Sequence, residues 1–185
     1  MAVGTGPWRP IGPLVLAACA ACSSSGDSAD AGSSGMFLPS AQSFDNFQSW
    51  QNKPATSQDD AGDGLHVGPL EVYWNQSPPH GATSFPVGTI IVKESEETDV
   101  TARTVFAMVK VGGAYNDGPG GAKGWEWFSL HNNGDGSVTV LWQGLQPPAL
   151  ESYAGQPIGD CNGCHSGAAT TNDYVWDSAL QLSSF

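Results

Sequence analysis

The stretch VGTIIVKESEETDVTARTVFAMVKV, residues 87–111, decides the fold class that we expect for this chain. Its two ends, residues 87–94 and 102–111, are rich in β-branched and other apolar residues, and the segment between them is acidic. Such a composition is typical of two strands joined by a solvated turn. We therefore predict an antiparallel strand pair over these residues.

Further strands are expected on either side of this pair. Residues 65–75 have a strand-like composition, and residues 125–131 and 137–142 form a second predicted hairpin around a turn at residues 132–136. No helical periodicity occurs between residues 64 and 144. These patterns predict an α+β fold that is predominantly an antiparallel β-sheet with a few short helices.

One short amphipathic helix is predicted before the sheet, over residues 43–52. Ser43 is placed to cap it, and three aromatic side chains can share one of its faces: Phe44, Phe47 and Trp50. Pro54 would end this helix. Folded structure is expected to begin near Phe37.

The pattern Cys-Asn-Gly-Cys-His at residues 161–165 carries the most specific chemical signal. Two cysteines separated by two residues and followed at once by histidine are typical of covalent haem attachment. Cys161 and Cys164 would bind the two haem vinyl groups, and His165 would coordinate the iron. A redox dithiol should lie beside a βαβ pattern and tetrahedral zinc needs a fourth ligand, and the sequence shows neither. We therefore expect haem c as the cofactor.

The N-terminus predicts export and lipid anchoring. Arg9 supplies a positive charge before an apolar segment that is too short to span a bilayer. The following Leu-Ala-Ala-Cys, residues 16–19, is similar to a bacterial lipobox. Residues 1–18 would then be a signal peptide, and Cys19 would be the lipidated residue. An ordinary cleaved signal is the alternative.

The segment after the anchor separates it from the folded part. Residues 19–36 are rich in Ser, Gly and Asp and should form a disordered tether, which leaves residues 37–185 as the haem domain. Only the lipid would hold the protein at the periplasmic face of a bacterial envelope. Ala20, directly after the anchor, favours the outer membrane over the inner one. Cys22 has no assigned role.

The net charge excludes one class of partner. Eighteen acidic residues against six Lys and Arg give a formal charge of −12, which argues against nucleic acid. The acidic segments at residues 59–63 and 94–99 are interpreted as solvated loops and strand ends. A docking patch for a cationic, soluble redox partner is the alternative. A homodimer is left open.

Several of these segments, taken together, resemble one family. The chain is similar to the cytochrome P-460 and cytochrome c′-beta group, which are monohaem, mostly β-sheet cytochromes of the bacterial envelope with CxxCH near the C-terminus. The resemblance spans about residues 37–176. It rests on five segments in matching order: residues 85–94, 108–110, 124–128, 161–165 and 173–176. The resemblance implies thioether bonds at Cys161 and Cys164, His165 as the proximal ligand, and an open sixth coordination site.

Lys93 is a further residue to which the resemblance gives a role. In the hydroxylamine-oxidising members a lysine of the corresponding strand is cross-linked to the haem, and Lys93 stands at that position. Strand alternation puts Lys93 on the same sheet face as Ile91 and Thr89. The alternative is an exposed strand lysine that pairs with Glu94 or Glu96.

The chain departs from the hydroxylamine-oxidising members on the distal side of the haem. Those members carry an arginine and a glutamate for proton transfer, and the matching positions here are Leu70 and Phe106. An apolar distal pocket lacks a general base and resembles the gas-binding cytochrome c′-beta branch, where aromatic residues cap the iron. An error of one residue in strand register would bring other groups to this side: Glu71, Tyr73, Glu126 or His131.

These observations predict an envelope monohaem c-type cytochrome that binds nitric oxide or a related small nitrogen species at an open distal iron site. One alternative is an enzyme that oxidises hydroxylamine through a haem cross-linked to Lys93, so the assignment as an enzyme is left open. Another is a simple electron-transfer cytochrome, in which Met108 or His131 is the second axial ligand. The apolar pair Leu70 and Phe106 favours the first function.

Overall fold

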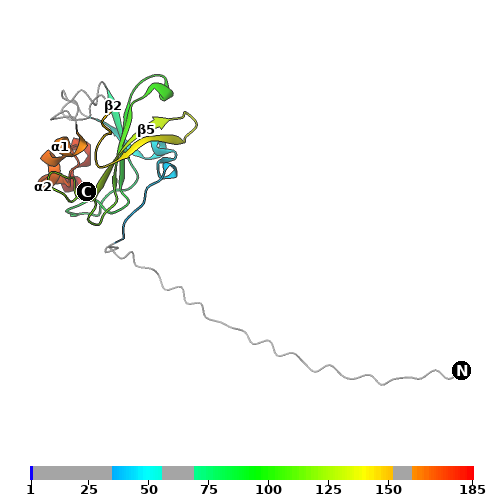
Figure 1. Cartoon of the computed structure of the whole chain (residues 1–185), viewed down its shortest axis with the longest axis horizontal. Helices are drawn as coiled ribbons and strands as arrows, with labels where there is room; N and C mark the ends of the chain where they lie inside the picture. The colour runs from blue at the N-terminus through cyan, green and yellow to red at the C-terminus, as the bar shows by residue number, and fades with distance from the viewer. Residues whose placement is uncertain (2–34, 56–68, 152–159) are drawn as a thin grey trace. The chain divides into compact units, whose positions relative to one another are not determined.

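Six antiparallel strands form one sheet in which the order of the strands follows their order in the chain (Figure 1). The strands are β1 (Gln51–Pro54), β2 (Leu70–Trp74), β3 (Ile90–Ser95), β4 (Val105–Lys110), β5 (Trp125–Asn132) and β6 (Val138–Gly144). Two α-helical turns follow the sheet, α1 (Cys161–His165) and α2 (Ala169–Asn172). The remaining helical segments are 3-10 turns: η1 (Ala41–Phe44), η2 (Phe47–Ser49), η3 (Val100–Ala102), η4 (Ser166–Ala168), η5 (Ser178–Leu180) and η6 (Leu182–Ser184). The predicted α+β class, dominated by an antiparallel sheet, is confirmed.

The computed structural model describes residues 1, 35–55, 69–151 and 160–185, and the fold belongs to the unit of residues 34–185. Cys19 and most of the predicted signal peptide and tether lie outside the described residues, as does the first part of the strand predicted at residues 65–75. In the part of the chain that is described, no helix has the length and apolar character needed to cross a membrane.

Both strand pairs predicted from the sequence are present. β3 and β4 pair antiparallel, with Lys93 opposite Phe106. β5 and β6 form the second hairpin, with His131 opposite Thr139. β2 pairs with β3 on its other side, so that Val72 lies opposite Lys93. The stretch at residues 87–111 is therefore central to the sheet, with two strands on each side of it.

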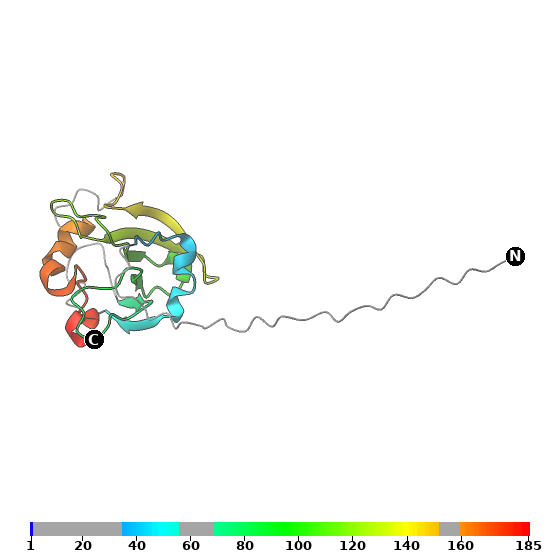
Figure 2. The ribbon, with the colours of Figure 1, turned by 90° about the horizontal axis from the view of Figure 1, so that it is seen from below.

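The sheet has two buried faces, each covered by a different part of the chain (Figure 2). On what we call the N-terminal face, the aromatic side chains of η1 and η2 pack against four sheet residues: Tyr73, Val92, Ala107 and Phe128. On the C-terminal face, side chains of residues 160–185 pack against the alternate set: Val72, Ile91, Met108 and Trp127. Because side chains alternate along each strand, one sheet supplies two separate cores. The CxxCH motif belongs to the C-terminal face.

The single helix predicted over residues 43–52 is wrong. The chain forms two 3-10 turns there, η1 and η2, and then enters β1. Asn46, between the turns, has a φ of 55°, a left-handed conformation that interrupts a helix. Phe44 and Phe47 are buried together, as the pattern of apolar residues indicates. Pro54 lies in β1 instead of at a helix end, on an edge strand where proline is tolerated.

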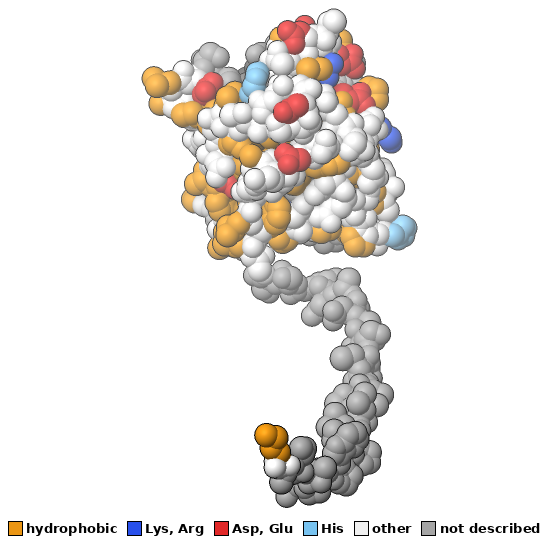
Figure 3. All heavy atoms as spheres, turned by 90° about the vertical axis from the view of Figure 1, so that its right-hand side faces the viewer, with side chains coloured by type: hydrophobic (Ala, Val, Ile, Leu, Met, Phe, Trp, Pro, Cys, Tyr) orange, Lys and Arg blue, Asp and Glu red, His pale blue; other side chains and the backbone are white. Residues whose placement is uncertain are grey.

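Charged side chains are spread thinly over the molecular surface shown in Figure 3. Acidic side chains are scattered there among polar and apolar ones, and Lys and Arg side chains are few. This distribution agrees with the formal charge of −12.

Glu94 is a buried carboxylate that ties η2 to the sheet. It is 1% exposed, so the expectation that all of residues 94–99 are solvated is wrong at this residue. Its Oε2 accepts hydrogen bonds from Gln48 Nε2 at 2.7 Å and from Arg103 Nη1 at 2.9 Å. Its Oε1 accepts one from Asn132 Nδ2 at 2.8 Å. Three charge-assisted donors compensate for the burial of this charge.

Replacing Glu94 with alanine should lower the free energy of unfolding by about 3 kcal/mol, because it leaves Arg103 Nη1 and the buried Asn132 Nδ2 without the acceptor that they share. Urea denaturation at neutral pH measures this change. The matched control is Asp117→Ala, which removes an exposed ion pair with Lys123 and should change the stability by less than about 0.5 kcal/mol. Equal losses in the two variants would contradict the role given to Glu94.

Candidate functional site

The CxxCH motif forms the single helical turn α1. The side chain of Asp160 caps the turn by accepting a hydrogen bond from the backbone N–H of Gly163. Cys161 and Cys164 form no disulfide, and both are half-buried. One turn therefore carries both thiols and His165, as covalent haem attachment requires.

Asn162, between the two cysteines, fastens this turn to the sheet. Its side chain is 6% exposed. Its Oδ1 accepts hydrogen bonds from Trp127 Nε1 at 2.8 Å, Asn116 Nδ2 at 2.8 Å and Ala122 N at 3.3 Å. Its Nδ2 donates to Asn116 Oδ1 at 3.1 Å and to the carbonyl oxygen of Leu145 at 3.2 Å. A buried amide with this many partners has one orientation, so it sets how α1 meets the C-terminal face.

His165 is held by a backbone carbonyl and an aromatic ring. Its Nδ1 lies 2.6 Å from the carbonyl oxygen of Tyr174, and its ring centroid lies 4.6 Å from that of Trp127. A carbonyl oxygen can only accept a hydrogen bond, so Nδ1 carries the proton and the lone pair of the neutral ring is on Nε2. This is the tautomer of an imidazole that binds a metal through Nε2.

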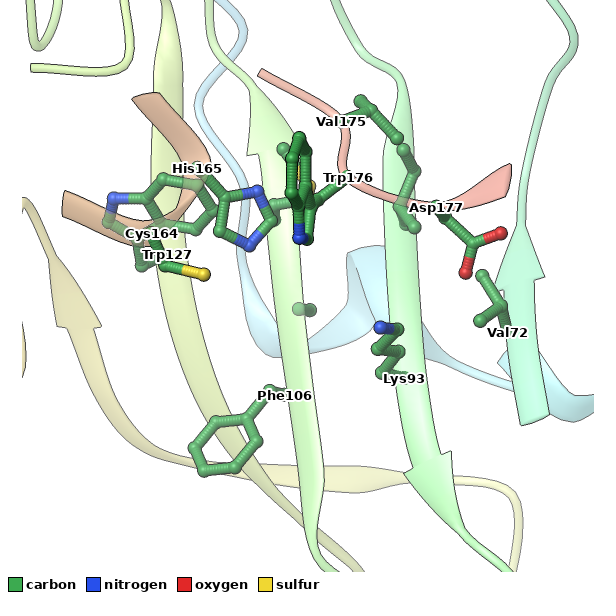
Figure 4. A pocket seen from close by; sticks show the side chains of 12 residues that line it. Val72, Lys93, Phe106, Trp127, Cys164, His165, Val175, Trp176 and Asp177 are labelled. Atoms are coloured by element: carbon green, nitrogen blue, oxygen red, sulfur yellow. The ribbon is translucent and has the colours of Figure 1, made fainter. Parts of the chain in front are cut away.

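A pocket lies beside His165 on the C-terminal face (Figure 4). Its empty volume, including the part that opens to solvent, is about 540 Å³. The inner strands contribute mainly apolar side chains and one lysine: Val72, Ile91, Lys93, Phe106 and Met108. The C-terminal segment contributes Cys164, His165, Val175, Trp176 and Asp177.

The structure brings most of the sequence-predicted site residues together. Lys93 and Phe106 line the same pocket as Cys164 and His165. Leu70 lies on the same sheet face, because it is two residues from Val72, and it is 4% exposed, but it is not among the residues that line the pocket.

The register of the strands decides among the other candidate residues. Glu71, Tyr73 and Glu126 lie on the N-terminal face, away from the pocket. His131 is on the C-terminal face by register but does not line the pocket. Met108 does line it, so of the two residues considered as a second axial ligand only Met108 lies at the pocket.

Lys93 is half-buried, not exposed as its alternative interpretation expects, and the pairing with Glu96 stays a prediction. Glu94, one of the two acidic residues expected to pair with it, points to the opposite face and binds Arg103. Figure 4 shows Lys93 and Asp177 on the β2–β3 side of the pocket, whereas Cys164 and Trp127 lie on the β5 side.

One acidic residue of the pocket, Asp177, is not singled out by any sequence pattern. Asp177 is 4% exposed, and its Oδ1 accepts a hydrogen bond from the backbone N–H of Ala179 at 2.7 Å, which caps η5. A lone aspartate beyond the CxxCH motif has no distinctive spacing, so only the folded chain reveals that Asp177 lines the pocket. Trp176, which belongs to the segment 173–176 that carries the family resemblance, also lines it and is 48% exposed.

The protonation of Cys161 bears on the alternative of a redox dithiol. Burial, with smaller contributions from Asp160 and Cys164, raises the pKa of Cys161 to about 12. The reactive thiols of dithiol oxidoreductases have lowered pKa values, because the thiolate is the nucleophile. The environment of Cys161 therefore favours a structural attachment point over a redox-active thiol.

The wider comparisons add no family assignment. Searches against protein-family models, curated proteins and solved structures find no match for this chain.

Among residues 35–55, 69–151 and 160–185, no three His, Cys, Asp or Glu side chains come close enough together to hold a metal ion. A haem iron needs only an axial side chain from the protein, because the porphyrin supplies its other ligands.

Replacing Asn162 with alanine should lower the free energy of unfolding by about 3 kcal/mol, because it removes the acceptor of the buried Trp127 Nε1–H and Ala122 N–H groups. The matched control, Ser166→Ala, removes an exposed hydrogen bond to the carbonyl of Gly163 and should cost less than about 0.5 kcal/mol. Urea denaturation of both variants checks this prediction, and a similar loss in the two would show that Asn162 does not fasten α1.

Proposed function

We propose that the protein is an envelope monohaem c-type cytochrome that binds nitric oxide or a related small nitrogen species at an open distal iron site. Cys161 and Cys164 would hold the haem covalently, and His165 would coordinate its iron. When bound, the haem supplies a redox-active iron that can take a small ligand. The residues fit this group, because two thiols that form no disulfide and an imidazole share one turn beside a pocket that opens to solvent.

The hydrogen bond between His165 and the carbonyl of Tyr174 carries the proposal. It keeps the proton on Nδ1, so that Nε2 is the atom able to coordinate. Combined with the two cysteines on the same turn, the bond supports a proximal ligand more strongly than the motif alone does.

The side chains of the inner strands support the choice of ligand. Val72, Ile91, Phe106 and Met108 are apolar, and a charged ligand beside them would lose its hydration without compensation. A small neutral molecule such as nitric oxide carries no such penalty. Phe106 also stands where the resemblance to the gas-binding branch implies an aromatic cap.

Absorption spectra of the reduced protein, recorded with and without nitric oxide, test this function. We expect a high-spin c-type spectrum that shifts on addition of nitric oxide. His165→Ala should retain the covalently attached haem but change its spin state and ligand affinity. The control is His131→Ala, which alters a histidine on the same face outside the pocket and should leave both spectra unchanged. Absence of an iron porphyrin, or a spectrum that nitric oxide does not alter, would overturn the proposal.

A second function, hydroxylamine oxidation, is favoured by a specific observation. Lys93 lies in the same pocket as Cys164, which suits a cross-link to the haem. Asp177 gives this pocket a carboxylate, whereas Leu70 and Phe106 offer no group that can exchange protons. The pocket is therefore not wholly apolar, and the enzyme alternative stays a candidate.

We expect hydroxylamine to be turned over slowly or not at all. The mass of tryptic peptides shows whether the haem peptide carries a second peptide with Lys93, and steady-state assays measure turnover. Activity that Lys93→Leu abolishes, while Lys53→Leu on the exposed strand β1 preserves it, would replace the binding function with the enzymatic one.

The electron-carrier alternative depends on Met108. A low-spin, six-coordinate spectrum that Met108→Leu converts to high spin would favour it. The proposed location is the periplasmic face of the envelope, with lipid on Cys19, which lies outside the described residues.

A further inference from the structure

Asp173 and Tyr174, which follow α2, both adopt left-handed backbone conformations. Their φ angles are 48° and 68°. This conformation is unfavourable for most residues with a Cβ atom, although asparagine and aspartate tolerate it. The other non-glycine residues with positive φ in the described part of the chain are two asparagines, so Tyr174 is the residue for which the conformation is strained. Strained residues persist where the surrounding structure fixes them, and they often serve a site.

The surrounding contacts do fix Asp173. Lys110 Nζ lies 2.7 Å from its Oδ1 and 2.9 Å from its Oδ2. The backbone N–H of Phe85 donates to Oδ2 at 2.9 Å, and Trp125 Nε1 donates to the Asp173 carbonyl at 2.8 Å. Lys110 also lies 4.9 Å from the centroid of the Trp125 ring. The sheet therefore anchors both the side chain and the main chain of this one residue.

The Asp173–Lys110 pair is largely buried. The two side chains are 9% and 11% exposed. Burial lowers the pKa of Lys110, and the charge and hydrogen bonds of Asp173 oppose that shift. A buried ion pair is weak evidence for stability, because an apolar pair of similar volume often stabilises as much. Directional anchoring is a role that an apolar pair cannot fill.

The residue after this anchor binds the candidate proximal ligand. The carbonyl of Tyr174 lies 2.6 Å from His165 Nδ1. The Tyr174 N–H donates to Ala168 O at 3.2 Å, and the Val175 N–H donates to Asn172 O at 3.0 Å. The peptide groups on both sides of Tyr174 are thus held, and the strained conformation aims its carbonyl at the imidazole.

We propose that the ion pair between Asp173 and Lys110 positions the Tyr174 carbonyl and thereby sets the strength of the His165 hydrogen bond, which tunes the proximal ligand. This inference rests on the proposed function. A stronger hydrogen bond from Nδ1–H makes the imidazole more basic, which strengthens its bond to iron and stabilises the oxidised state. Asp173 and Lys110 are positioning residues that act through Tyr174.

Three variants of the haem-loaded protein test the pair. Lys110→Met and Asp173→Asn should weaken the hydrogen bond, so the iron–histidine stretching frequency in resonance Raman spectra of the ferrous protein should fall and the reduction potential should rise. Lys110→Arg, which can still pair with a carboxylate through two bonds, should restore most of both values. A change in folding stability alone would not alter the stretching frequency or the reduction potential.

The matched control is Lys123→Met, which makes the same change of charge at an exposed pair. It should leave the stretching frequency and the potential unchanged. If Lys110→Met does not fold, Asp173→Asn supplies the same readout, because asparagine tolerates the left-handed conformation. Unchanged values in Asp173→Asn, or equal shifts in Lys123→Met, would overturn the positioning role while leaving the cytochrome function intact. A wild-type protein without haem c would overturn the proposed function itself.

Discussion

The contact between α1 and the C-terminal face is the constraint on which the site depends. Asn162 makes this contact with hydrogen bonds to Trp127, Asn116, Ala122 and Leu145, groups that are far from it in the sequence. Without these bonds a turn of five residues has little reason to be helical, because so short a helix is not stable alone. The buried amide of Asn162 fixes the position of α1 on the sheet, and this position decides which side chains face the pocket.

The two-faced sheet explains how one small domain can hold both a structural core and the pocket beside His165. Aromatic residues of η1 and η2 fill the N-terminal face, and Glu94 adds a satisfied polar network there. That face needs no cofactor to be complete. The C-terminal face is covered by short turns instead of a long helix, and these leave space beside His165. A cofactor that occupies this space would complete the second core.

The sequence predicted the parts of the fold that depend on local patterns. The β-branched stretches at residues 87–94 and 102–111 correspond to β3 and β4, and the hairpin of β5 and β6 follows from the same reasoning. The strand β1 was missed because its sequence, Gln-Asn-Lys-Pro, is polar and its side chains are exposed. The error over residues 43–52 has a different cause. The spacing of Phe44 and Phe47 fits 3-10 turns as well as an α-helix, so the sequence pattern does not distinguish the two.

Some residues of the candidate site could be predicted from local sequence signals, whereas others are brought to the site only by tertiary contacts. CxxCH is a local signal, and strand alternation together with the family resemblance pointed to Lys93 and Phe106, which do line the pocket. Asp177 and the hydrogen bond of Tyr174 could not be predicted, because they arise only when the C-terminal segment packs on the sheet. The bond between Phe85 and Asp173, for example, joins residues 88 positions apart.

The central claim is that Cys161 and Cys164 hold a haem covalently. The most direct test is the intact mass, under denaturing conditions, of protein produced with a cytochrome c maturation system. We expect a mass increase equal to one haem in the wild type and no increase in a Cys161→Ala, Cys164→Ala double variant. An unmodified wild-type mass, or an increase that persists in the double variant, would contradict it.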